Sequence, residues 1–580
     1  MTPNAAKSTI RALLLVTGAW LLAGCNIAER PLDGPTVSSP DFGPNVFVFD
    51  PSTPDIQKHV DRVFARQEKS QFGSDRYALL FKPGKYNLDM QVGFYTQVAG
   101  LGRSPDDVEI VGAVRAHAKW MKGNATCNFW RSAENFSITP TRIDVPNMWG
   151  VSQGASMRRV HVRGDLLLAD HGWSSGGFLA DCKIDGEVHS GSQQQWFSRN
   201  SDWDKWVGGN WNMVFVGCEN PPEGEWPERP YTRIAKTPLK REKPFLFVDE
   251  EGRYAVMVPE LQKETSGVTW ESGSPVGTPI AIEHFFIARP DRDSAATMNA
   301  ALTSGKHLLL TPGIYFLDAP IKVRSPNTVV LGLGYATLVP SNGTAAIEIG
   351  DVSGVKIASI LIDADERASP TLVQVGDPEA SLYHAAEPTF LFDVFCRAGG
   401  ARVGSTKSFV TINSNNVVGD NLWLWRADHG TGAKWHINRN ENGLIVNGND
   451  VTVHGLFVEH CHEYQTVWNG EGGKVYFYQS EMPYDPPYQE AWMHDGVHGY
   501  ASYKVADHVK THEAWGLGVY CVFWDAPIIA DTAIEAPDRP GISMNHMVTI
   551  RLNGKPDSGI CRVINDRGEP VMYQQKAVLK

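Results

Sequence analysis

Two glutamates of one segment, Glu459 in "FVEH" and Glu481 in "YQSEMPYD", are separated by an offset of 22 in the sequence. If one turn of a strand-rich coil has about 22 residues, the two carboxyl groups lie on neighbouring strands, about 4.8 Å apart. Like charges at that distance disfavour joint ionisation and raise the pKa of one member. A carboxylic acid kept protonated near neutral pH can protonate a glycosidic oxygen. The pair indicates acid catalysis on a glycoside, although a solvated surface ladder or a pair neutralised by Arg or Lys would show the same spacing.

A second polar pair shows the same offset. Gln153 ("WGVSQGAS") and Ser175 ("WSSGGF") are also separated by 22 in the numbering. Neutral polar side chains on adjacent strands can hold a water molecule without being nucleophiles themselves. On spacing alone, ordinary stacked polar residues on one face of a coil are the simpler explanation.

The segments around these residues are a series of short strands with Asn, Gly and Asp at the bends. "NGLIVNGNDVTVHGLFVEH", followed by "GGKVYFYQSEM", is representative, and long helical periodicity is scarce. A strand-rich unit that recurs at about 22 residues is typical of a parallel β-helix, in which each turn stacks on the last. The same offset of 22 separates three apolar pairs: Val453 and Val475, Met157 and Leu179, and Val162 and Ile184.

One unit of the sequence is duplicated. "LLFKPGKYNLD" (79–89) and "LLLTPGIYFLD" (308–318) follow the helix-like segments "DIQKHVDRVFARQ" and "DSAATMNAAL", and precede "VAGLG" (98–102) and "VLGLG" (330–334). A β-helix has an open end that needs a cap, and each helix-like segment would supply one. We therefore expect an all-β fold with two tandem parallel β-helices and short capping helices. The predicted domains are 42–270 and 271–525, followed by a strand-rich tail, 526–580.

Length and charge narrow the function classes. A chain of 580 residues is too long for one compact core. A formal net charge of −12 argues against a nucleic-acid partner, which needs clustered Lys and Arg. Eighteen Trp residues offer flat faces that could stack on sugar rings, although most Trp residues in any protein are packing residues. The sequence carries no indication of oligomeric state.

The N-terminus resembles a bacterial lipoprotein signal. Lys7 and Arg11 precede the apolar run "ALLLVTGAWLL", which is too short to span a bilayer, and "LAGC" ends at Cys25. We expect residues 1–25 to be the signal, Cys25 to be lipidated, and 26–41 to form a polar tether. The protein would then be exported to the periplasm, outer membrane or cell surface, with the lipid as its membrane contact. An ordinary secretory signal with a chance cysteine is the alternative.

Cysteine and histidine patterns do not indicate a metal or a cofactor. The seven remaining cysteines show no CxxC spacing, which argues against zinc ribbons and a disulfide framework. His460 and His462 alternate along a strand and could join His454 around a metal, but alternation makes such pairs common. We therefore predict neither a metal nor a cofactor.

"VEHCHEYQTVWNGEGGKVYFYQSEMPYD" resembles the active-site region of family 55 glycoside hydrolases, the β-1,3-glucanases. Those carry V-E-H, a Tyr-Gln pair and Q-[ST]-E-x-P-Y in this order. "NFWRSAENFSI" (128–138), "VSQGASMRRVHV" (151–162), and "SGGFLADCKIDG" with "GSQQQWFSRN" (175–200) are similar as well. The resemblance implies two right-handed β-helices side by side with the active site between them.

By the same resemblance, Glu481 is the general acid, Gln153 and Ser175 hold the attacking water, and Glu459 is a second active-site carboxylate. The expected reaction is exo-acting hydrolysis of a β-1,3-glucan with inversion. Shorter loops, and "FIARPDRDSAATMN" in place of the usual "GAKGDGxTDD" opening, leave the linkage and the exo or endo mode open. The expected substrate contacts are Gln193, Gln194, Trp468 and Tyr484.

The stereochemistry is not fixed by the spacing. Carboxyl groups about 5 Å apart suit a retaining nucleophile, whereas inversion needs about 6.5–9.5 Å and room for water. The resemblance places the water on the other β-helix, so inversion is the expectation.

Other classes share the fold. A polygalacturonase-like hydrolase needs paired Asp motifs, which "ADHGTGAKW" (427–435) matches poorly, and a pectate lyase needs a compact acidic cluster that the sequence lacks. The alternative from a different class is a non-catalytic glycan-binding or adhesive β-helix surface lipoprotein. It would keep the fold and the Trp residues without requiring Glu481.

Overall fold

The computed structural model describes residues 40–142, 144–271, 276–573 and 575–580. The predicted signal segment, the lipidation site Cys25 and almost all of the tether lie outside these residues. Among the described residues, no helix combines the length and the apolar character needed to cross a membrane. The compact unit is Ser39–Lys580.

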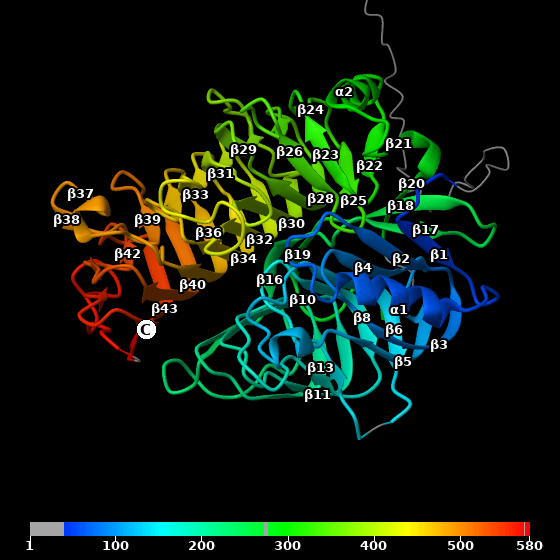
Figure 1. The fold of residues 1–580 in the computed structure, drawn as a ribbon, viewed down its shortest axis with the longest axis horizontal. Helices are drawn as coiled ribbons and strands as arrows, with labels where there is room; N and C mark the ends of the chain where they lie inside the picture. Colours follow the sequence, from blue (N-terminus) through cyan, green and yellow to red (C-terminus); the bar gives the residue numbers. More distant parts are fainter. Residues whose placement is uncertain (1–39, 143, 272–275, 574) are drawn as a thin grey trace, which may run out of the picture. The chain divides into compact units, whose positions relative to one another are not determined.

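The first β-helix, drawn in blue to cyan and green in Figure 1, is a single 15-stranded sheet with parallel pairing. Residues 237–265 and 277–281 then leave this path and form two small antiparallel sheets of two and three strands. The elements are β1 (Val46–Phe49), α1 (Ile56–Gln67), β2 (Tyr77–Phe81), β3 (Gly84–Gln91), β4 (Thr96–Gly100), β5 (Val108–Arg115), β6 (Arg131–Thr139), β7 (Asn147–Met148), β8 (Ser156–Val162), β9 (Leu166–Leu167), β10 (Phe178–Ala180), β11 (Lys183–His189), β12 (Gln195–Arg199), β13 (Asp202–Val207), β14 (Asn212–Val216), β15 (Tyr231–Ile234), β16 (Thr237–Lys240), β17 (Phe245–Val248), β18 (Tyr254–Pro259), β19 (Gln262–Thr265) and β20 (Gly277–Ala281).

The second β-helix, drawn in green to red, has two long sheets of 13 and 8 strands, which are parallel except for the last strand of the larger sheet. Its elements are β21 (Phe285–Ala288), α2 (Ala295–Thr303), β22 (His307–Leu310), β23 (Ile314–Leu317), β24 (Ile321–Val323), β25 (Val329–Gly332), β26 (Thr337–Pro340), β27 (Ile347–Ile349), β28 (Lys356–Asp363), β29 (Ser369–Val375), β30 (Thr389–Ala398), β31 (Thr406–Ile412), β32 (Val417–Arg426), β33 (Asn440–Val446), β34 (Thr452–Glu459), β35 (Thr466–Trp468), β36 (Gly473–Glu481), β37 (Met493–His494), β38 (Val497–His498), β39 (Tyr503–Val505), β40 (His512–Phe523), β41 (Ile529–Ala530), β42 (Ile534–Glu535), β43 (Ile542–Gly554), β44 (Gly559–Ile560) and β45 (Lys576–Leu579).

The predicted stacking is confirmed. Val453 pairs with Val475 in parallel register, and both side chains are buried in the core of the second β-helix. Met157 pairs with Leu179, and Ile184 with Val162, on the first. Other turns are longer because loops are inserted, and Val418 of β32 pairs with Thr452 of β34 at an offset of 34. The prediction of two tandem parallel β-helices is therefore correct, whereas the predicted period holds only for some turns.

The duplicated Pro-Gly-x-Tyr unit makes the same hydrogen bonds near the start of each β-helix. The hydroxyl of Tyr86 donates to the carbonyls of Phe49 and Lys82, and the hydroxyl of Tyr315 donates to those of Ala288 and Thr311. Each tyrosine thus ties its Pro-Gly turn to the preceding strand. The glycines of these turns, at 84 and 313, lie at φ 144° and 155°, and a Cβ there would meet a proline ring at 2.3 and 2.4 Å. The capping helices α1 and α2 bury apolar residues at helical spacing over each β-helix end.

Both β-helices bend their long strands at residues in the left-handed conformation. Gly455 in β34 has φ 74°, and Phe477, its neighbour in β36, has φ 72°. A Cβ on Gly455 would lie 3.1 Å from the Phe178 ring of the first β-helix, so this bend faces the other domain. Each bend lies four residues before a glutamate, which places Glu459 and Glu481 at equivalent points of consecutive turns.

The two β-helices meet over a buried interface that is partly apolar and partly ionic. Aromatic residues of both domains form one cluster that includes Trp130 and Trp423, with ring centroids 5.5 Å apart. Arg158 contacts Asp393 at 2.8 Å and Asp420 at 3.1 Å, and Arg199 contacts Asp420 at 2.9 Å. Because an unpaired buried charge is costly, each of these arginines is matched by a carboxylate of the other β-helix.

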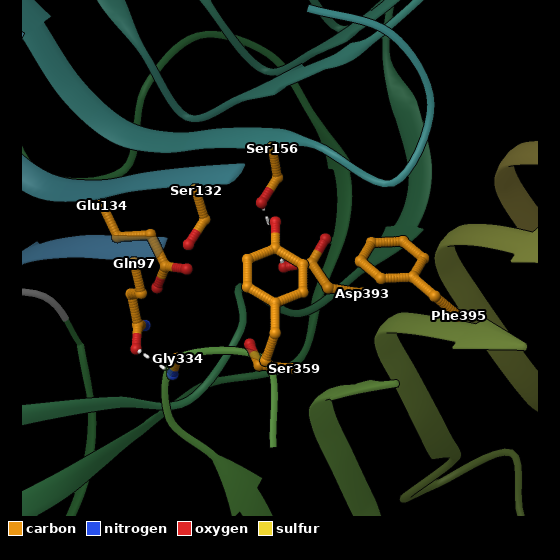
Figure 2. A pocket seen from close by; sticks show the side chains of 9 residues that line it. Gln97, Ser132, Glu134, Ser156, Gly334, Ser359, Asp393 and Phe395 are labelled. Carbon is orange, nitrogen blue, oxygen red and sulfur yellow. Dashed lines mark hydrogen bonds between the residues drawn. The ribbon is translucent and has the colours of Figure 1, made fainter. Parts of the chain in front are cut away.

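Figure 2 shows a small polar cavity in this interface. It is lined from the first β-helix by Gln97, Ser132, Glu134 and Ser156, and from the second by residues that include Gly334, Ser359, Asp393 and Phe395.

The segment predicted as a C-terminal tail pairs with the second β-helix. β43 runs parallel to β40 from His512 to Phe523, which adds a further turn to the coil. β45 then pairs antiparallel with β43.

Candidate active site

Glu459 and Glu481 are the last residues of β34 and β36 and pair directly in parallel register. Both are nearly buried, with 4% and 9% of their surface exposed. The predicted adjacency of the two carboxylates is therefore present, at the point where the second β-helix faces the first.

The first β-helix supplies the polar pair predicted from the same offset. Gln153 donates from Nε2 to Oε1 of Glu459 at 2.8 Å, across the domain interface. Ser175 Oγ lies 3.1 Å from Oε1 of Gln153 and 3.0 Å from Oγ of Ser152. A continuous polar path therefore runs from Ser175 through Gln153 to Glu459, and it joins the two β-helices.

Glu459 accepts a second donor from its own β-helix. The indole Nε1 of Trp423 donates to Oε2 of Glu459 at 2.9 Å. Both carboxyl oxygens of Glu459 therefore accept an N–H group, which fixes its orientation.

Glu481 has different neighbours. The hydroxyl of Tyr484 donates to Oε2 of Glu481. Nε2 of His460 lies 3.6 Å from the same oxygen, and the His460 ring packs on Tyr484 with centroids 4.3 Å apart. Nδ1 of His460 lies 3.2 Å from the carbonyl of Arg426, which orients the ring with Nε2 toward Glu481.

The electrostatics of the pair follow from burial and proximity. Burial, and then the negative charge of Glu481, raise the pKa of Glu459 to about 8. Burial disfavours the charged form of His460, but its contact with Glu481 and the charge of Asp428 outweigh this and raise its pKa. With a pKa of about 8, Glu459 holds a proton at neutral pH.

Comparison with known proteins assigns this arrangement to a family. A model described as the LAM55 pectate lyase-like domain matches residues 285–481. An exo-β-1,3-glucanase of Streptomyces sp. (strain SirexAA-E / ActE) is 49% identical over 538 residues, which cover 92% of this chain and 88% of that protein. The chain belongs to family 55 of the glycoside hydrolases.

Solved structures agree with this family 55 assignment. The structure of SacteLam55A from Streptomyces sp. SirexAA-E matches with a TM-score of 0.91 at 48% identity, over 93% of this chain and 98% of that one. A glutamate-to-alanine variant of SacteLam55A in complex with glucose matches equally, with a TM-score of 0.91 at 48% identity, over 94% and 98% of the two chains. This family 55 member is therefore a glycoside hydrolase, and the family resemblance seen in the sequence is confirmed.

Of the four residues expected to contact substrate, two are partly exposed and two are buried. Tyr484 touches Glu481, and Gln194 lies half-buried just after the Ser174–Gln193 bridge. Gln193 is fully buried: its Nε2 donates to the carbonyls of Val151 and Leu168, and its Oε1 accepts from the backbone N–H of Gly176, next to Ser175.

Trp468 is also fully buried, inside the apolar core of the second β-helix. These placements leave Tyr484 and Gln194 as the predicted contacts with some exposure.

Two residues of the site were missed from the sequence. His460 stands beside Glu459 in the quoted motif, but alternation alone would turn it away; its left-handed backbone, φ 67°, brings its ring to Glu481. Trp423 lies 36 positions before Glu459 in the sequence. The turn of the coil between β32 and β34 has 34 residues because a loop is inserted, so that Trp425 pairs with Glu459 and Trp423 lies two residues before it. A search restricted to offsets of 22 could not have found it.

The described residues hold no group of three or more His, Cys, Asp or Glu side chains placed to bind a metal. His454 contacts the carbonyl of Leu239 and His462 that of Trp435, so the three histidines considered in the sequence point to different partners.

Proposed function

We propose that this protein hydrolyses β-1,3-glucan from the chain end by an inverting mechanism, with Glu481 as the general acid. The observation that carries the proposal is the contact of Glu459 with Gln153 across the domain interface, directly beside Glu481. The linkage and the chain-end mode are supported by the exo-β-1,3-glucanase relative and by the glucose complex of SacteLam55A.

In this mechanism the proton held by Glu459 is the one that reaches the leaving group. Glu459 accepts N–H donors at both oxygens, which suits its carboxylate form. Because burial keeps a proton on Glu459 at rest, the productive state requires that this proton move to Glu481, from which it passes to the glycosidic oxygen as the bond to the sugar breaks. The hydroxyl of Tyr484 orients the Glu481 carboxyl group for that transfer.

The attacking water is held on the other side of the site. Ser175 and Gln153 offer hydroxyl and amide groups 3.1 Å from each other, and Glu459 is the adjacent base that accepts a proton from the water. Water and acid then act on opposite faces of the anomeric carbon, which gives inversion. Inversion requires that Glu459, held by Gln153 and Trp423, act on the water and not on the anomeric carbon.

The enzymatic test is a panel of β-1,3-, β-1,4- and β-1,6-linked glucans with product analysis. Wild type should release glucose from the β-1,3-glucan, and Glu481→Gln should lose activity by about 10²–10⁴-fold while still binding the glycan. Glu490→Gln, an exposed glutamate of the same β-helix, is the control. Binding without hydrolysis by wild type would favour the non-catalytic glycan-binding lipoprotein.

We also propose that the protein is exported and anchored by lipid at Cys25. The motif "LAGC" and the preceding apolar run support this. Cys25→Ser should move the protein out of the membrane fraction, whereas the control Cys561→Ser, a half-buried cysteine, should not. Mass spectrometry that finds an intact Met1 in cells would contradict the proposal.

A further inference from the structure

We infer that Tyr335 is a positioning residue for hydrolysis, acting from the second β-helix on the turn that carries Gln153. The hydroxyl of Tyr335 donates to the carbonyl of Gly154 at 3.0 Å, across the domain interface. Gly154 directly follows Gln153 in the chain. The inference rests on the proposed function, since it assigns a role in holding the attacking water.

The turn at Gly154 is also packed tightly against two tryptophan rings. Gly154 lies at φ 66°, and a Cβ there would come within 2.7 Å of the Trp423 ring and 3.1 Å of Trp130. Trp423 in turn donates to Glu459, as does Gln153. These contacts form one connected network. Tyr335 holds Gly154 against Trp423, and both Gln153 and Trp423 donate to Glu459.

Tyr335 is itself held in an unusual conformation. Its backbone lies at φ 61°, which is strained for an aromatic residue and persists only where the surroundings enforce it. The preceding Gly334 donates its N–H to Oε1 of Gln97 at 2.9 Å, and Figure 2 shows this contact between the two domains. A Cβ at Gly334 would lie 2.6 Å from the Tyr77 carbonyl oxygen, so the turn is pressed against the first β-helix.

This arrangement also assigns a role to the duplicated "VLGLG" segment. Its last glycine contacts Gln97 in β4 of the first β-helix, and the tyrosine that follows contacts the turn that carries Gln153. Tyr335 is 6% exposed and packs on Phe395 and Tyr95, at centroid distances of 6.2 and 6.5 Å. Tyr335→Phe would keep this packing and remove only the hydroxyl.

The test compares Tyr335→Phe with Tyr315→Phe in the full chain on a β-1,3-gluco-oligosaccharide. Tyr315 is a buried tyrosine of the same β-helix whose hydroxyl donates to the carbonyls of Ala288 and Thr311, and not to the turn that carries Gln153. Tyr335→Phe should lower kcat about tenfold with KM within about twofold, because a loosened Gln153 orients the water poorly. It should also move the alkaline limb of the pH profile upward, because a weaker donor to Glu459 stabilises its charged form less.

Tyr315→Phe should lower the melting temperature at least as much while leaving kcat and the pH profile unchanged. Equal kcat and pH profiles in Tyr335→Phe and wild type would overturn the inference. The same loss of kcat in Tyr335→Phe and Tyr315→Phe would also overturn it. Full activity in Glu481→Gln would instead refute the proposed function, so the two failures are distinguishable.

Discussion

Replacing Glu459 by Gln should remove a pH dependence of stability that wild type carries. The pKa of Glu459 rises from an ordinary 4.5 to about 8 in the folded protein, because the group is buried beside Glu481. Folding therefore takes up a proton between these two pH values, and the folded state loses stability as the pH rises through that window.

The magnitude follows from the two pKa values. Each pH unit within the window is worth about 1.36 kcal/mol. Between pH 5 and 7, wild type should therefore lose about 2.5 kcal/mol relative to Glu459→Gln. The compact unit Ser39–Lys580 has an unfolding entropy of about 1.1 kcal/mol per kelvin, so the loss corresponds to about 2 °C.

The assay is thermal unfolding of both proteins from pH 5 to 7, followed by intrinsic fluorescence. The quantity of interest is the change in melting temperature with pH, because Gln also disturbs the hydrogen bonds from Gln153 and Trp423 at every pH. Glu490→Gln, with an exposed side chain, should follow wild type. Parallel curves for wild type and Glu459→Gln would refute the argument that burial and Glu481 keep a proton on this pair.

Three further predictions concern activity and the domain interface. The rate should fall above about pH 8, because Glu459 then loses the proton that must reach the leaving group; a kcat/KM profile on β-1,3-gluco-oligosaccharide that still rises at pH 9 would exclude this. Asp420→Asn should cost about 3–5 kcal/mol and lower the melting temperature by several degrees, because Arg158 and Arg199 each lose a buried anionic partner; an unchanged melting temperature would contradict it. Trp524→Ala should raise KM for long glucans more than for glucose dimers, because this ring is 49% exposed and packs edge-on to Tyr484 at the site; equal KM changes for both substrates would count against it.

Much of the fold was predictable because residues stacked on consecutive turns of a β-helix recur at a regular offset in the sequence. Val453 and Val475 lie in one core column, as their offset indicated. The Pro-Gly-x-Tyr unit is duplicated because in each β-helix its tyrosine hydroxyl donates to the last residue of the neighbouring strand, Phe49 of β1 or Ala288 of β21. The extra turn formed by β43 was not foreseen, because His512 of β40 pairs with Ile542 of β43 at an offset of 30 rather than 22.

The site was predictable only where both partners share one domain and one period. The adjacency of Glu459 and Glu481 required only that one turn match the predicted period. The contact between Gln153 and Glu459 joins positions 306 apart in the sequence and depends on how two domains pack, which no local pattern encodes. Gln193 and Trp468 were expected at the substrate, but polar and aromatic residues of a β-helix also serve its interior, and burial alone separates these roles.

The most direct test uses NMR to identify the anomer that wild type releases from a β-1,3-glucan during the first minutes. The activity of Glu481→Gln is measured on the same substrate. Together they decide whether Glu481 acts as the acid of an inverting reaction. Inversion predicts that the α-anomer appears first, and the acid role predicts that Glu481→Gln retains glycan binding with hydrolysis reduced by about 10²–10⁴-fold. Initial release of the β-anomer, or full activity in Glu481→Gln, would contradict this mechanism.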